Sequence, residues 1–503
     1  MSRITNAQTT FSTMHWAVRG IAFAALGALV ATGQAPTNFW WLALAAMAVA
    51  FAMIPTTSGA RALWHGWSFG VGYFAIALRW IISPFLVHIE RDGWMAPFAL
   101  ILMAGGFALF WALATWMTHR VFRWHWLALP LMLTIAEVTR SLILTGFPWA
   151  LIGHTLVATP YAQLAAFGGP HLLTLLFTLT AAAIAAVRLW TVLPVLVAAA
   201  IAWPLLTPGA RTFDTDAPMV RLIQPNAPQE EKWDPVMSGV FFDRMLGFTG
   251  EGEVPDLVVW PESAIASLLN FADPWLTQMA DAARGAPIIV GVNREEAGRY
   301  YNSFVHVGRA GNIEGFYDKQ HLVPFGEYIP GGDLMHRVGI RGFGSSYGGG
   351  FTPGDGRRTL NVPGLGPIRP LICYEGIFSE EVGGTQERPR AMVLVTNDAW
   401  FGKAAGPYQH LAQAQLRAIE QGLPMVRVAN TGVSAMIDPQ GRITGALPLN
   451  EAGYIDLPLP PAGQPTFYAR FGDWPTFALL MIFLSIPTIG RLQKSLDPPD
   501  PAA

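Results

Sequence analysis

The sequence contains almost no cysteine. Cys373 is the single cysteine in a chain of 503 residues. No intramolecular disulfide bond is therefore available, and the thiol serves either in packing or in chemistry. A lone cysteine is more often a small core residue than a nucleophile. Here, however, it ends the apolar run 370–373 and is followed two residues later by the carboxylate of Glu375, which favours chemistry.

Charged residues are also scarce. Asp, Glu, Lys and Arg make up 13% of the chain, whereas soluble domains average about 25%. Hydrophobic residues make up 52% of the chain, including 19 Trp and 30 Phe. This composition predicts that a large part of the chain lies in lipid. The net charge of −2 argues against a nucleic-acid partner.

The apolar residues are concentrated in long segments before residue 207 and in one segment near the C-terminus. A helix of about 20 residues crosses the roughly 30 Å of hydrocarbon in a bilayer. On that basis we predict eight spans, at residues 15–33, 39–56, 62–87, 94–118, 124–145, 160–187, 188–207 and 473–490. The sequence at 168–170, Gly-Gly-Pro, indicates either a kink in the sixth span or a different boundary for it.

The basic residues of the short loops predict the orientation of these spans. If the N-terminus is cytoplasmic, the short outside loops hold only Arg91, beside Glu90 and Asp92. The short inside segments then hold Arg3, Arg61, Arg120, Arg123, Arg188, Arg491 and Lys494. Because basic residues favour the cytoplasmic side, we expect residues 208–472 to lie outside the cytoplasm.

Two arginines, Arg79 and Arg140, fall within the predicted spans. An ionisable residue inside a membrane is costly and faces the bundle interior or a water-filled cavity. Alternatively, a long basic side chain near a helix end extends to the interface. The sequence leaves both interpretations open.

The composition changes between residues 211 and 470. Short β-rich runs recur there, several of them continuously apolar, as in strands buried on both faces: 219–224, 257–260, 287–292, 303–307, 370–373, 391–396, 425–429 and 433–437. An amphipathic helix is indicated by the spacing of Tyr408, Ala412, Leu416, Ile419 and Leu423. We therefore predict a seven-span membrane domain at 1–210, an extracytoplasmic α/β domain at 211–470, and a last span with a cytoplasmic tail at 471–503.

The stretch 339–356 is too rich in glycine for a regular element and predicts a long loop. Phe343, Tyr347 and Phe351 interrupt it with aromatic rings. Such rings suit a lid at a lipid interface that contacts substrate. A plain surface loop fits the same sequence equally well.

Three chemically useful side chains accompany β-rich runs. Glu262 follows 257–261, Lys319 lies within 317–324, and Cys373 ends its own run. We expect them to converge at one edge of a sheet. A thiol with an ordinary pKa of about 8.5 needs a base or a nearby positive charge to become a nucleophile. A carboxylate accepts its proton, and a lysine stabilises the oxyanion of a tetrahedral intermediate. Taken singly, Glu262 and Lys319 are more often surface charges.

The strings around these residues carry a specific resemblance. WPES at 260–263, YDKQHLVPFGEY at 317–328 and ICYEG at 372–376 resemble, in this order, the nitrilase superfamily of carbon–nitrogen hydrolases. With the membrane spans before and after them, the chain resembles the apolipoprotein N-acyltransferase family of the bacterial inner membrane. The resemblance covers essentially the whole chain. It implies an αββα sandwich on an eight-span membrane platform, with the catalytic domain on the periplasmic side.

The resemblance also implies roles for individual residues. Glu262 is the expected general base, Lys319 the oxyanion-stabilising residue, and Cys373 the nucleophile that forms a thioester. The remaining matches are supporting or substrate-binding residues: Glu327, which positions Lys319 and Cys373; Tyr374 and Glu375, which flank the nucleophile; and Trp233, in an arm near the lipid site.

The reaction implied by the resemblance is ping-pong and uses no cofactor or metal. The thiolate attacks the sn-1 ester of a phospholipid, usually phosphatidylethanolamine, and leaves a lysophospholipid and an acyl-enzyme. The α-amino group of the diacylglyceryl-cysteine of an apolipoprotein then takes the acyl chain. Water must be kept from the thioester, a task that suits the 339–356 loop. A monomer is the simplest expectation.

Two other functions remain open. One is a membrane-tethered carbon–nitrogen hydrolase acting on a small amide, which would not need eight spans. The other is a transporter whose outer domain only binds substrate. That function predicts ionisable residues within the spans, and few are present beyond Arg79 and Arg140.

Overall fold

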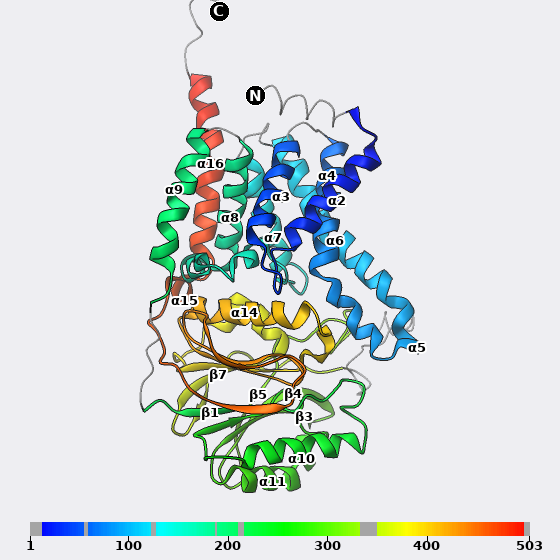
Figure 1. The fold of residues 1–503 in the computed structure, drawn as a ribbon, viewed down its shortest axis with the longest axis vertical. Helices are drawn as coiled ribbons and strands as arrows, with labels where there is room; N and C mark the ends of the chain where they lie inside the picture. The colour runs from blue at the N-terminus through cyan, green and yellow to red at the C-terminus, as the bar shows by residue number, and fades with distance from the viewer. Residues whose placement is uncertain are drawn as a thin grey trace, which may run out of the picture. The chain divides into compact units, whose positions relative to one another are not determined.

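The structure is a computed structural model that describes residues 13–54, 59–121, 127–186, 189–209, 216–331 and 350–496. The chain forms two compact units (Figure 1). The first unit combines Met1–Arg79, Pro97–Thr207 and Phe471–Ala503. The second unit combines Pro208–Arg470 with Trp80–Ala96, a segment that lies in sequence between two helices of the first unit.

The described part of the first unit is helical. A helix overlaps each predicted span: α2 (Trp16–Ala31), α3 (Trp40–Met53), α4 (Ala60–Ala77), α6 (Ala96–Val121), α7 (Ala128–Leu142), α8 (Ala165–Ala185), α9 (Leu189–Leu206) and α16 (Trp474–Leu496). The third predicted span, 62–87, is not one continuous helix, because α4 ends at Ala77 and the 3-10 helix Arg79–Leu86 follows it at an angle of 48°. The kink predicted in the sixth span is confirmed, because Gly168 and Gly169 have non-helical backbone angles within α8.

Length and apolarity distinguish these helices from one another. In the part of the chain that the structure describes, two helical segments are long and apolar enough to cross a membrane, Ile89–Arg120 and Pro160–Ala185. A third is added if the bent pair Ala60–Ala77 and Arg79–Leu86 counts as one span. The other apolar helices are shorter, so a platform of eight spans stays a prediction.

Two glycines allow α2 and α4 to pack closely. A Cβ atom added to Gly27 would lie 1.9 Å from the carbonyl oxygen of Phe69, and one added to Gly72 would lie 1.8 Å from that of Ala24. A side chain at either position therefore has no room unless the helices separate. Small residues at such crossings are typical of helices that pack in membranes.

Arg140 lies in the interior of the first unit and is paired there. Its Nη2 atom lies 2.8 Å from Oε2 of Glu137, and both side chains are fully buried. Its Nη1 atom donates to the carbonyl of Trp149 at 2.9 Å, and Trp111 donates to Glu137 at 2.8 Å. Of the two interpretations left open, Arg140 thus follows the interior one, with a partner that offsets its charge. Arg79 is exposed.

The second unit contains two six-stranded sheets. The first has the order β12-β1-β2-β3-β4-β5 and the second the order β11-β10-β9-β8-β7-β6. The strands of the first sheet are β1 (Met219–Gln224), β2 (Leu257–Val259), β3 (Ile288–Glu296), β4 (Arg299–Val307), β5 (Ile313–Asp318) and β12 (Gly453–Pro458). Those of the second are β6 (Leu360–Val362), β7 (Gly366–Ile372), β8 (Ala391–Thr396), β9 (Met425–Ala429), β10 (Ser434–Ile437) and β11 (Ile443–Leu447). The inner pairs β1–β2, β2–β3, β7–β8 and β8–β9 are parallel.

The alternation of side chains along β8 builds two cores at once. Ala391, Val393 and Val395 belong to a core shared by both sheets, whereas Met392 and Leu394 join a core with helix α14 (Gly406–Gln421). This alternation explains why a strand buried on both faces is apolar throughout.

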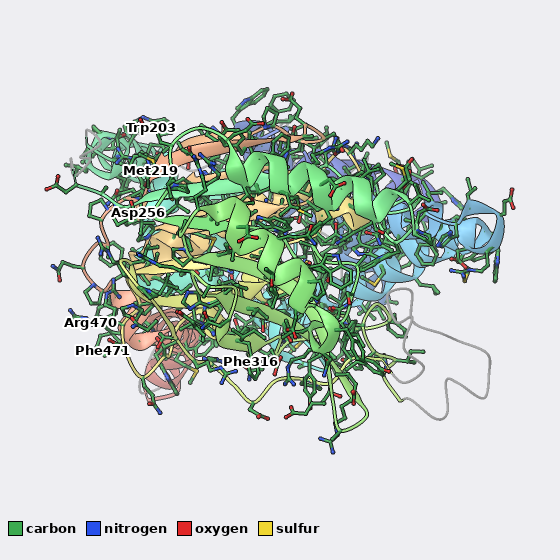
Figure 2. The ribbon with its side chains drawn as sticks, turned by 90° about the horizontal axis from the view of Figure 1, so that it is seen from below. Trp203, Met219, Asp256, Phe316, Arg470 and Phe471 are labelled. Carbon is green, nitrogen blue, oxygen red and sulfur yellow. The ribbon has the colours of Figure 1, made fainter. Side chains whose placement is uncertain are left out.

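The first sheet is layered in the same way. Its outer face packs on α10 (Met237–Gly250) and α11 (Asp273–Ala283), which lie side by side over the sheet in Figure 2. Figure 1 shows these helices and α14 on opposite sides of the paired sheets. The αββα sandwich implied by the resemblance is therefore confirmed. The ends of β1 and β2 are aligned by Asp256, whose carboxylate accepts a hydrogen bond from the Met219 backbone at 2.7 Å (Figure 2).

Candidate active site

The three predicted catalytic residues each follow a strand, but the strands belong to different sheets. Glu262 lies three residues after β2 ends, and Lys319 directly follows β5, both in the first sheet. Cys373 directly follows β7 in the second sheet. The expectation of one sheet edge was therefore wrong. The residues meet because the two sheets stack face to face over a common core, which places their strand ends opposite each other.

Cys373 sits in a strained turn that Glu375 holds in place. Its φ angle is +48°, a conformation that costs a non-glycine residue about 1–3 kcal/mol. The buried Glu375 carboxylate accepts hydrogen bonds from the Ile372 backbone at 2.8 Å, the Gln320 backbone at 2.7 Å and the Tyr317 hydroxyl at 2.6 Å. Because Tyr317 and Gln320 belong to the β5 region, this carboxylate ties the nucleophile's turn to the opposite sheet.

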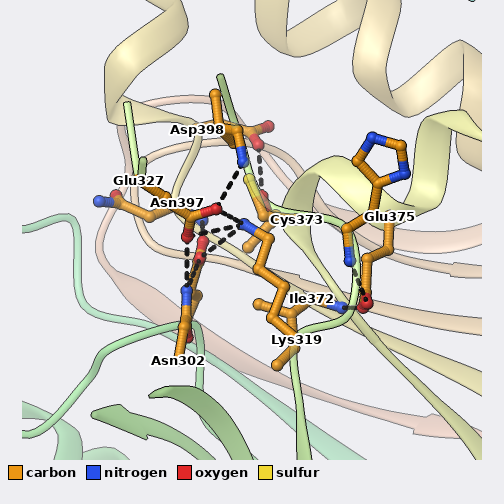
Figure 3. A network of polar contacts seen from close by, with 12 residues as sticks. Asn302, Lys319, Glu327, Ile372, Cys373, Glu375, Asn397 and Asp398 are labelled. Atoms are coloured by element: carbon orange, nitrogen blue, oxygen red, sulfur yellow. Dashed lines mark hydrogen bonds and ion pairs between the residues drawn. The ribbon is translucent and has the colours of Figure 1, made fainter. Parts of the chain in front are cut away.

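Two carboxylates and a lysine form a buried network beside the thiol (Figure 3). Lys319 Nζ lies 2.9 Å from Glu327 Oε2 and 3.7 Å from Glu262 Oε1. Asn302 Nδ2 donates to Oε1 of both carboxylates, at 2.8 Å for Glu262 and 3.0 Å for Glu327. Figure 3 shows Lys319, Glu327 and Asn302 converging beside Cys373. Glu262, Lys319 and Cys373 are at most 6% exposed.

The charges of this network set the protonation state of the thiol at rest. Burial raises the pKa of Cys373, the charge of Glu262 raises it further, and Lys319 only partly opposes them. Burial lowers the pKa of Lys319, but Glu327 and Glu262 outweigh this and hold it above its ordinary value. Cys373 is therefore a neutral thiol and Lys319 a cation. A nucleophilic role for this thiol would require a base to take its proton, and Glu262 is the carboxylate whose charge raises the pKa of the thiol most.

The second oxygen of Glu262 is bound by the start of a 3-10 turn. The backbone N–H of Asn397 donates to Oε2 at 2.8 Å. The Asn397 side chain donates to Gln229 at 2.7 Å and accepts from Asn430 at 2.9 Å. Asn397 thus binds the Glu262 carboxylate directly, and Asn430 holds the Asn397 side chain.

Lys232 and Trp233 occupy an arm beside Glu262. Lys232 Nζ donates to the backbone carbonyl of Glu262 at 3.1 Å, and burial lowers the pKa of Lys232 to about 8 against the opposing charges of Glu262 and Cys373. Trp233 is 47% exposed and, with Lys232, Glu262 and Asn430, lines a pocket. This position suits the substrate contact predicted for Trp233.

The remaining predicted residues are Tyr374 and the three aromatic residues of the 339–356 loop. Tyr374 is buried and packs edge-on against His321 and Phe378. The backbone of Phe351 donates to the carbonyl of Glu327 at 2.9 Å. Phe343 and Tyr347, like most of the 339–356 loop, lie outside the described residues, so the lid stays a prediction.

Sequence reasoning did not single out Asn302 or Lys232. The available signals were weak: an asparagine at the head of the apolar run 303–307, and a lysine next to a tryptophan that had been named. Among the described residues, no group of His, Cys, Asp and Glu side chains is arranged to hold a metal ion.

Comparison with known families matches both parts of the chain. Residues 252–463 match the carbon-nitrogen hydrolase family, and residues 26–183 match the apolipoprotein N-acyltransferase N-terminal domain. Among solved structures, a CN-hydrolase superfamily protein from Xanthomonas campestris is 19% identical with a TM-score of 0.37, covering 53% of this chain and 97% of its own.

Similar proteins align over nearly the full length. The apolipoprotein N-acyltransferase of Brucella melitensis is 36% identical over 456 residues, which is 86% of this chain and 85% of the relative. That of Rhodopseudomonas palustris is 35% identical over 499 residues, 92% of this chain and 93% of the relative. By these alignments, and by the match of its N-terminal region, the chain belongs to the apolipoprotein N-acyltransferase family.

Proposed function

We propose that this protein transfers an acyl chain from a phospholipid to the α-amino group of the N-terminal diacylglyceryl-cysteine of apolipoproteins, the last step of bacterial lipoprotein maturation. The observation that carries the proposal is a buried thiol, Cys373, next to a carboxylate and a lysine in a member of this family. Membership of an acyltransferase family favours this function over the amidase and transporter alternatives.

In the first half-reaction, Cys373 attacks the sn-1 ester carbonyl of the phospholipid while Glu262 takes the thiol proton. A C–S bond forms, and the carbonyl oxygen becomes an oxyanion that the Lys319 ammonium stabilises. When the intermediate collapses, the C–O bond of the ester breaks and Glu262 returns the proton to the leaving alkoxide. The products are a lysophospholipid and an acyl thioester on Cys373.

In the second half-reaction, the neutral α-amine of the apolipoprotein attacks the thioester carbonyl. Glu262 accepts a proton from the amine nitrogen, and Lys319 again stabilises the oxyanion. The C–S bond then breaks, and the proton on Glu262 passes to the sulfur of Cys373. The products are an amide on the lipoprotein and the resting thiol, so the protons balance over the full cycle. The covalent intermediate divides one difficult transfer into two easier ones.

Exclusion of water is part of the proposal, because a thioester exposed to solvent hydrolyses. Support comes from the burial of Glu262, Lys319 and Cys373. We assign the closing of the site to the 339–356 loop, whose Phe351 is fixed to the backbone of Glu327. Shortening this loop is expected to raise hydrolysis of the acyl-enzyme relative to transfer. Unchanged transfer would refute the role of a lid.

The membrane setting belongs to the same proposal. Eight spans, an inner-membrane location and a periplasmic second unit are supported by the helices at the apolar segments and by the basic residues of the predicted inside loops. We also propose that phosphatidylethanolamine is the acyl donor and that the protein is a monomer.

Labelled phosphatidylethanolamine incubated with the purified protein in detergent tests the function. We expect a hydroxylamine-sensitive adduct on the wild type and none on Cys373→Ser. Addition of a synthetic diacylglyceryl-cysteine peptide should remove the acyl chain from the enzyme and yield an amide on the peptide. Absence of an adduct on the wild type, with lipid shown to be accessible by a control acyltransferase, would refute the proposal. Ammonia release from small amides without any adduct would instead support the amidase.

A further inference from the structure

The turn that carries Cys373 is held from both faces of the second sheet. On one face, Glu375 ties the turn to the β5 region of the first sheet through the hydrogen bonds described above. Helix α14 packs on the other face, and His410 of that helix reaches the nucleophile. Its Nε2 atom lies 3.3 Å from the carbonyl oxygen of Cys373. His410 is fully buried and has no part in the mechanism above.

The contact with Cys373 fixes the place of one hydrogen on the His410 ring. A carbonyl oxygen only accepts hydrogen bonds, so Nε2 carries a hydrogen and donates it. The other ring nitrogen, Nδ1, lies 2.9 Å from Asp398 Oδ1 and 3.1 Å from Arg427 Nη2. Nε2 keeps its hydrogen both when Nδ1 donates to the carboxylate and when it accepts from the guanidinium. His410 is thus a hydrogen-bond donor to the backbone of the nucleophile.

The neighbours of His410 hold its ring in the orientation that this donation needs. Asp398, beside Nδ1, is itself fixed by two donors. Arg427 Nη2 in β9 donates to Oδ2 at 2.5 Å, and the Thr396 hydroxyl donates to Oδ1 at 2.9 Å. Phe401 packs edge-on against the imidazole, with the ring centroids 5.6 Å apart. These contacts keep Nε2 directed at the nucleophile.

The buried carboxylate of Asp398 also strengthens the donor. Burial raises the pKa of Asp398, but Arg427 and His410 outweigh this effect and hold the pKa well below its ordinary range. Asp398 is therefore ionised. Hydrogen bonds in series polarise one another in a low-dielectric interior. A carboxylate beside Nδ1 therefore makes the hydrogen on Nε2 a better donor to the Cys373 carbonyl.

The backbone of Cys373 needs support because it is strained. A φ angle of +48° is unfavourable for a residue with a side chain, so the turn would relax toward ordinary angles if nothing held it. Such a rotation would move the sulfur relative to Glu262 and Lys319. A displacement of about 1 Å in an active site can lower the rate about 10²-fold. A hydrogen bond at the Cys373 carbonyl opposes that rotation.

We propose that His410 is a positioning residue for the nucleophile, whose Nε2 hydrogen bond to the Cys373 carbonyl keeps the strained turn in the conformation that presents the sulfur to Glu262 and to the lipid ester. The inference rests on the proposed function for its kinetic consequence. The hydrogen bond itself does not depend on which substrate the site accepts.

The single cysteine makes this hydrogen bond directly observable. Cysteine labelled with ¹³C at the carbonyl places the label at Cys373 alone in the full-length protein. The histidine rings are labelled with ¹⁵N, and the protein is reconstituted in phosphatidylcholine vesicles. Solid-state NMR should then show a dipolar coupling between the Cys373 carbonyl carbon and a protonated ring nitrogen. This coupling should vanish in His410→Asn.

Two substitutions separate the hydrogen bond from the rest of the ring. The side-chain nitrogen of Gln reaches about as far as Nε2, whereas that of Asn ends near the position of Nδ1. His410→Asn should shift the Cys373 carbonyl resonance upfield, because loss of the hydrogen bond leaves the carbonyl carbon more shielded. His410→Gln should return the resonance toward its wild-type position.

The matched control is His306→Asn in β4. His306 is 1% exposed, and its Nε2 atom faces the carboxylate of Glu314 at 3.6 Å and not the nucleophile. The substitution therefore removes an equally buried imidazole beside a carboxylate. It should leave the Cys373 carbonyl resonance at its wild-type position.

Single-turnover formation of the acyl-enzyme from labelled phosphatidylethanolamine gives the functional readout. His410→Asn should lower the maximal rate about 10- to 100-fold, the factor that corresponds to one strong hydrogen bond. The lipid concentration for half-maximal rate should stay unchanged, because the turn and not the lipid site is altered. His410→Gln should recover most of the lost rate. His306→Asn should keep the wild-type rate even if its melting temperature falls.

Two results would overturn the inference: a wild-type spectrum without the coupling, or a His410→Asn protein that keeps both the carbonyl resonance and the rate of the wild type. If His410→Asn does not fold, as judged by circular dichroism, the coupling in the wild type and the resonance of His410→Gln decide. Failure of the proposed function is distinguishable, because the NMR measurement needs no acyl donor. It would appear as a missing phospholipid adduct on a wild type that shows the coupling.

Discussion

At the scale of single residues, the chemistry of this site depends on the charges of its buried carboxylates and on the hydrogen bonds that hold them in place. Glu262 and Glu327 share one amide donor, Asn302, and one ammonium, Lys319. The thiol beside them is held neutral by burial and by the charge of Glu262. We therefore expect the proton to leave the thiol during attack, and not before it.

Substitution of the base and of the lysine is expected to separate thiol reactivity from acyl transfer. In Glu262→Gln, acyl-enzyme formation should fall by about 10²–10⁴-fold, because the proton acceptor is lost. Alkylation by iodoacetamide should not fall, since removal of the Glu262 charge lowers the pKa of Cys373. In Lys319→Met both rates should fall, since Lys319 lowers that pKa. Parallel loss of both rates in Glu262→Gln would contradict this assignment.

Asp398 gives a prediction for stability against pH. Its pKa in the folded protein is depressed, so its contribution is present above the unfolded pKa of about 3.9 and is lost only as the pH falls through the folded value. The melting temperature of Asp398→Asn should lie well below that of the wild type at neutral pH, and the gap should narrow below about pH 4. The control is Asp281→Asn, at an exposed position. The difference between its melting temperature and that of the wild type should be the same at neutral pH and below about pH 4.

The pKa of Glu375 is shifted in the opposite direction to that of Asp398. Burial raises its pKa in the folded state, against the hydrogen bond from Tyr317 and the charge of Arg369. Its contribution to stability is therefore full below the unfolded pKa of about 4.3 and is reduced as the pH rises through the folded value. Glu375→Ala leaves the Tyr317 hydroxyl and two backbone donors without their acceptor, each at about 1–3 kcal/mol. Chemical denaturation should show a loss of several kcal/mol, and a loss under about 1 kcal/mol would contradict the role given to this carboxylate.

At the scale of elements, apolar pattern and small residues decide the packing. The runs 219–224, 391–396 and 425–429 coincide with β1, β8 and β9 because each strand is buried along nearly all of its length and consists mostly of apolar residues. Strands such as β11 and β12 were missed, since their residues are only partly buried and carry no clear alternation. A strand is thus easier to predict from the sequence the more completely it is buried.

The crossing of α2 and α4 makes a prediction at this scale. Gly72→Ala places a Cβ atom against the Ala24 carbonyl, and overpacking of this kind costs about 1–3 kcal/mol. The melting temperature of the detergent-solubilised protein should fall. Gly106→Ala in α6 is the matched control, because a Cβ atom there meets nothing within 4 Å. Equal melting temperatures for the two variants would show that the crossing relaxes without cost.

At the scale of the whole molecule, the proposed topology places the second unit outside the cytoplasm. In a Cys373→Ser background, a cysteine at Asp281 should react with a membrane-impermeant maleimide in intact spheroplasts. A cysteine at Arg61, in a predicted inside loop, should react only after permeabilisation. Both positions are exposed, so a difference in labelling reports the side of the membrane. Labelling of Arg61→Cys in intact cells would overturn the orientation.

The sequence by itself determined the features that depend on local pattern: where apolar helices lie, which buried strands form, and, through three short strings, which residues to examine. Only the tertiary structure decided that Cys373 comes from a different sheet than Glu262 and Lys319. It alone also brought Asn302 between two carboxylates and placed His410 and Arg427 beside the buried carboxylate of Asp398. The physical reason is that apolar periodicity is written in neighbouring residues, whereas a hydrogen bond between side chains far apart in the chain exists only once two sheets and their helices have packed.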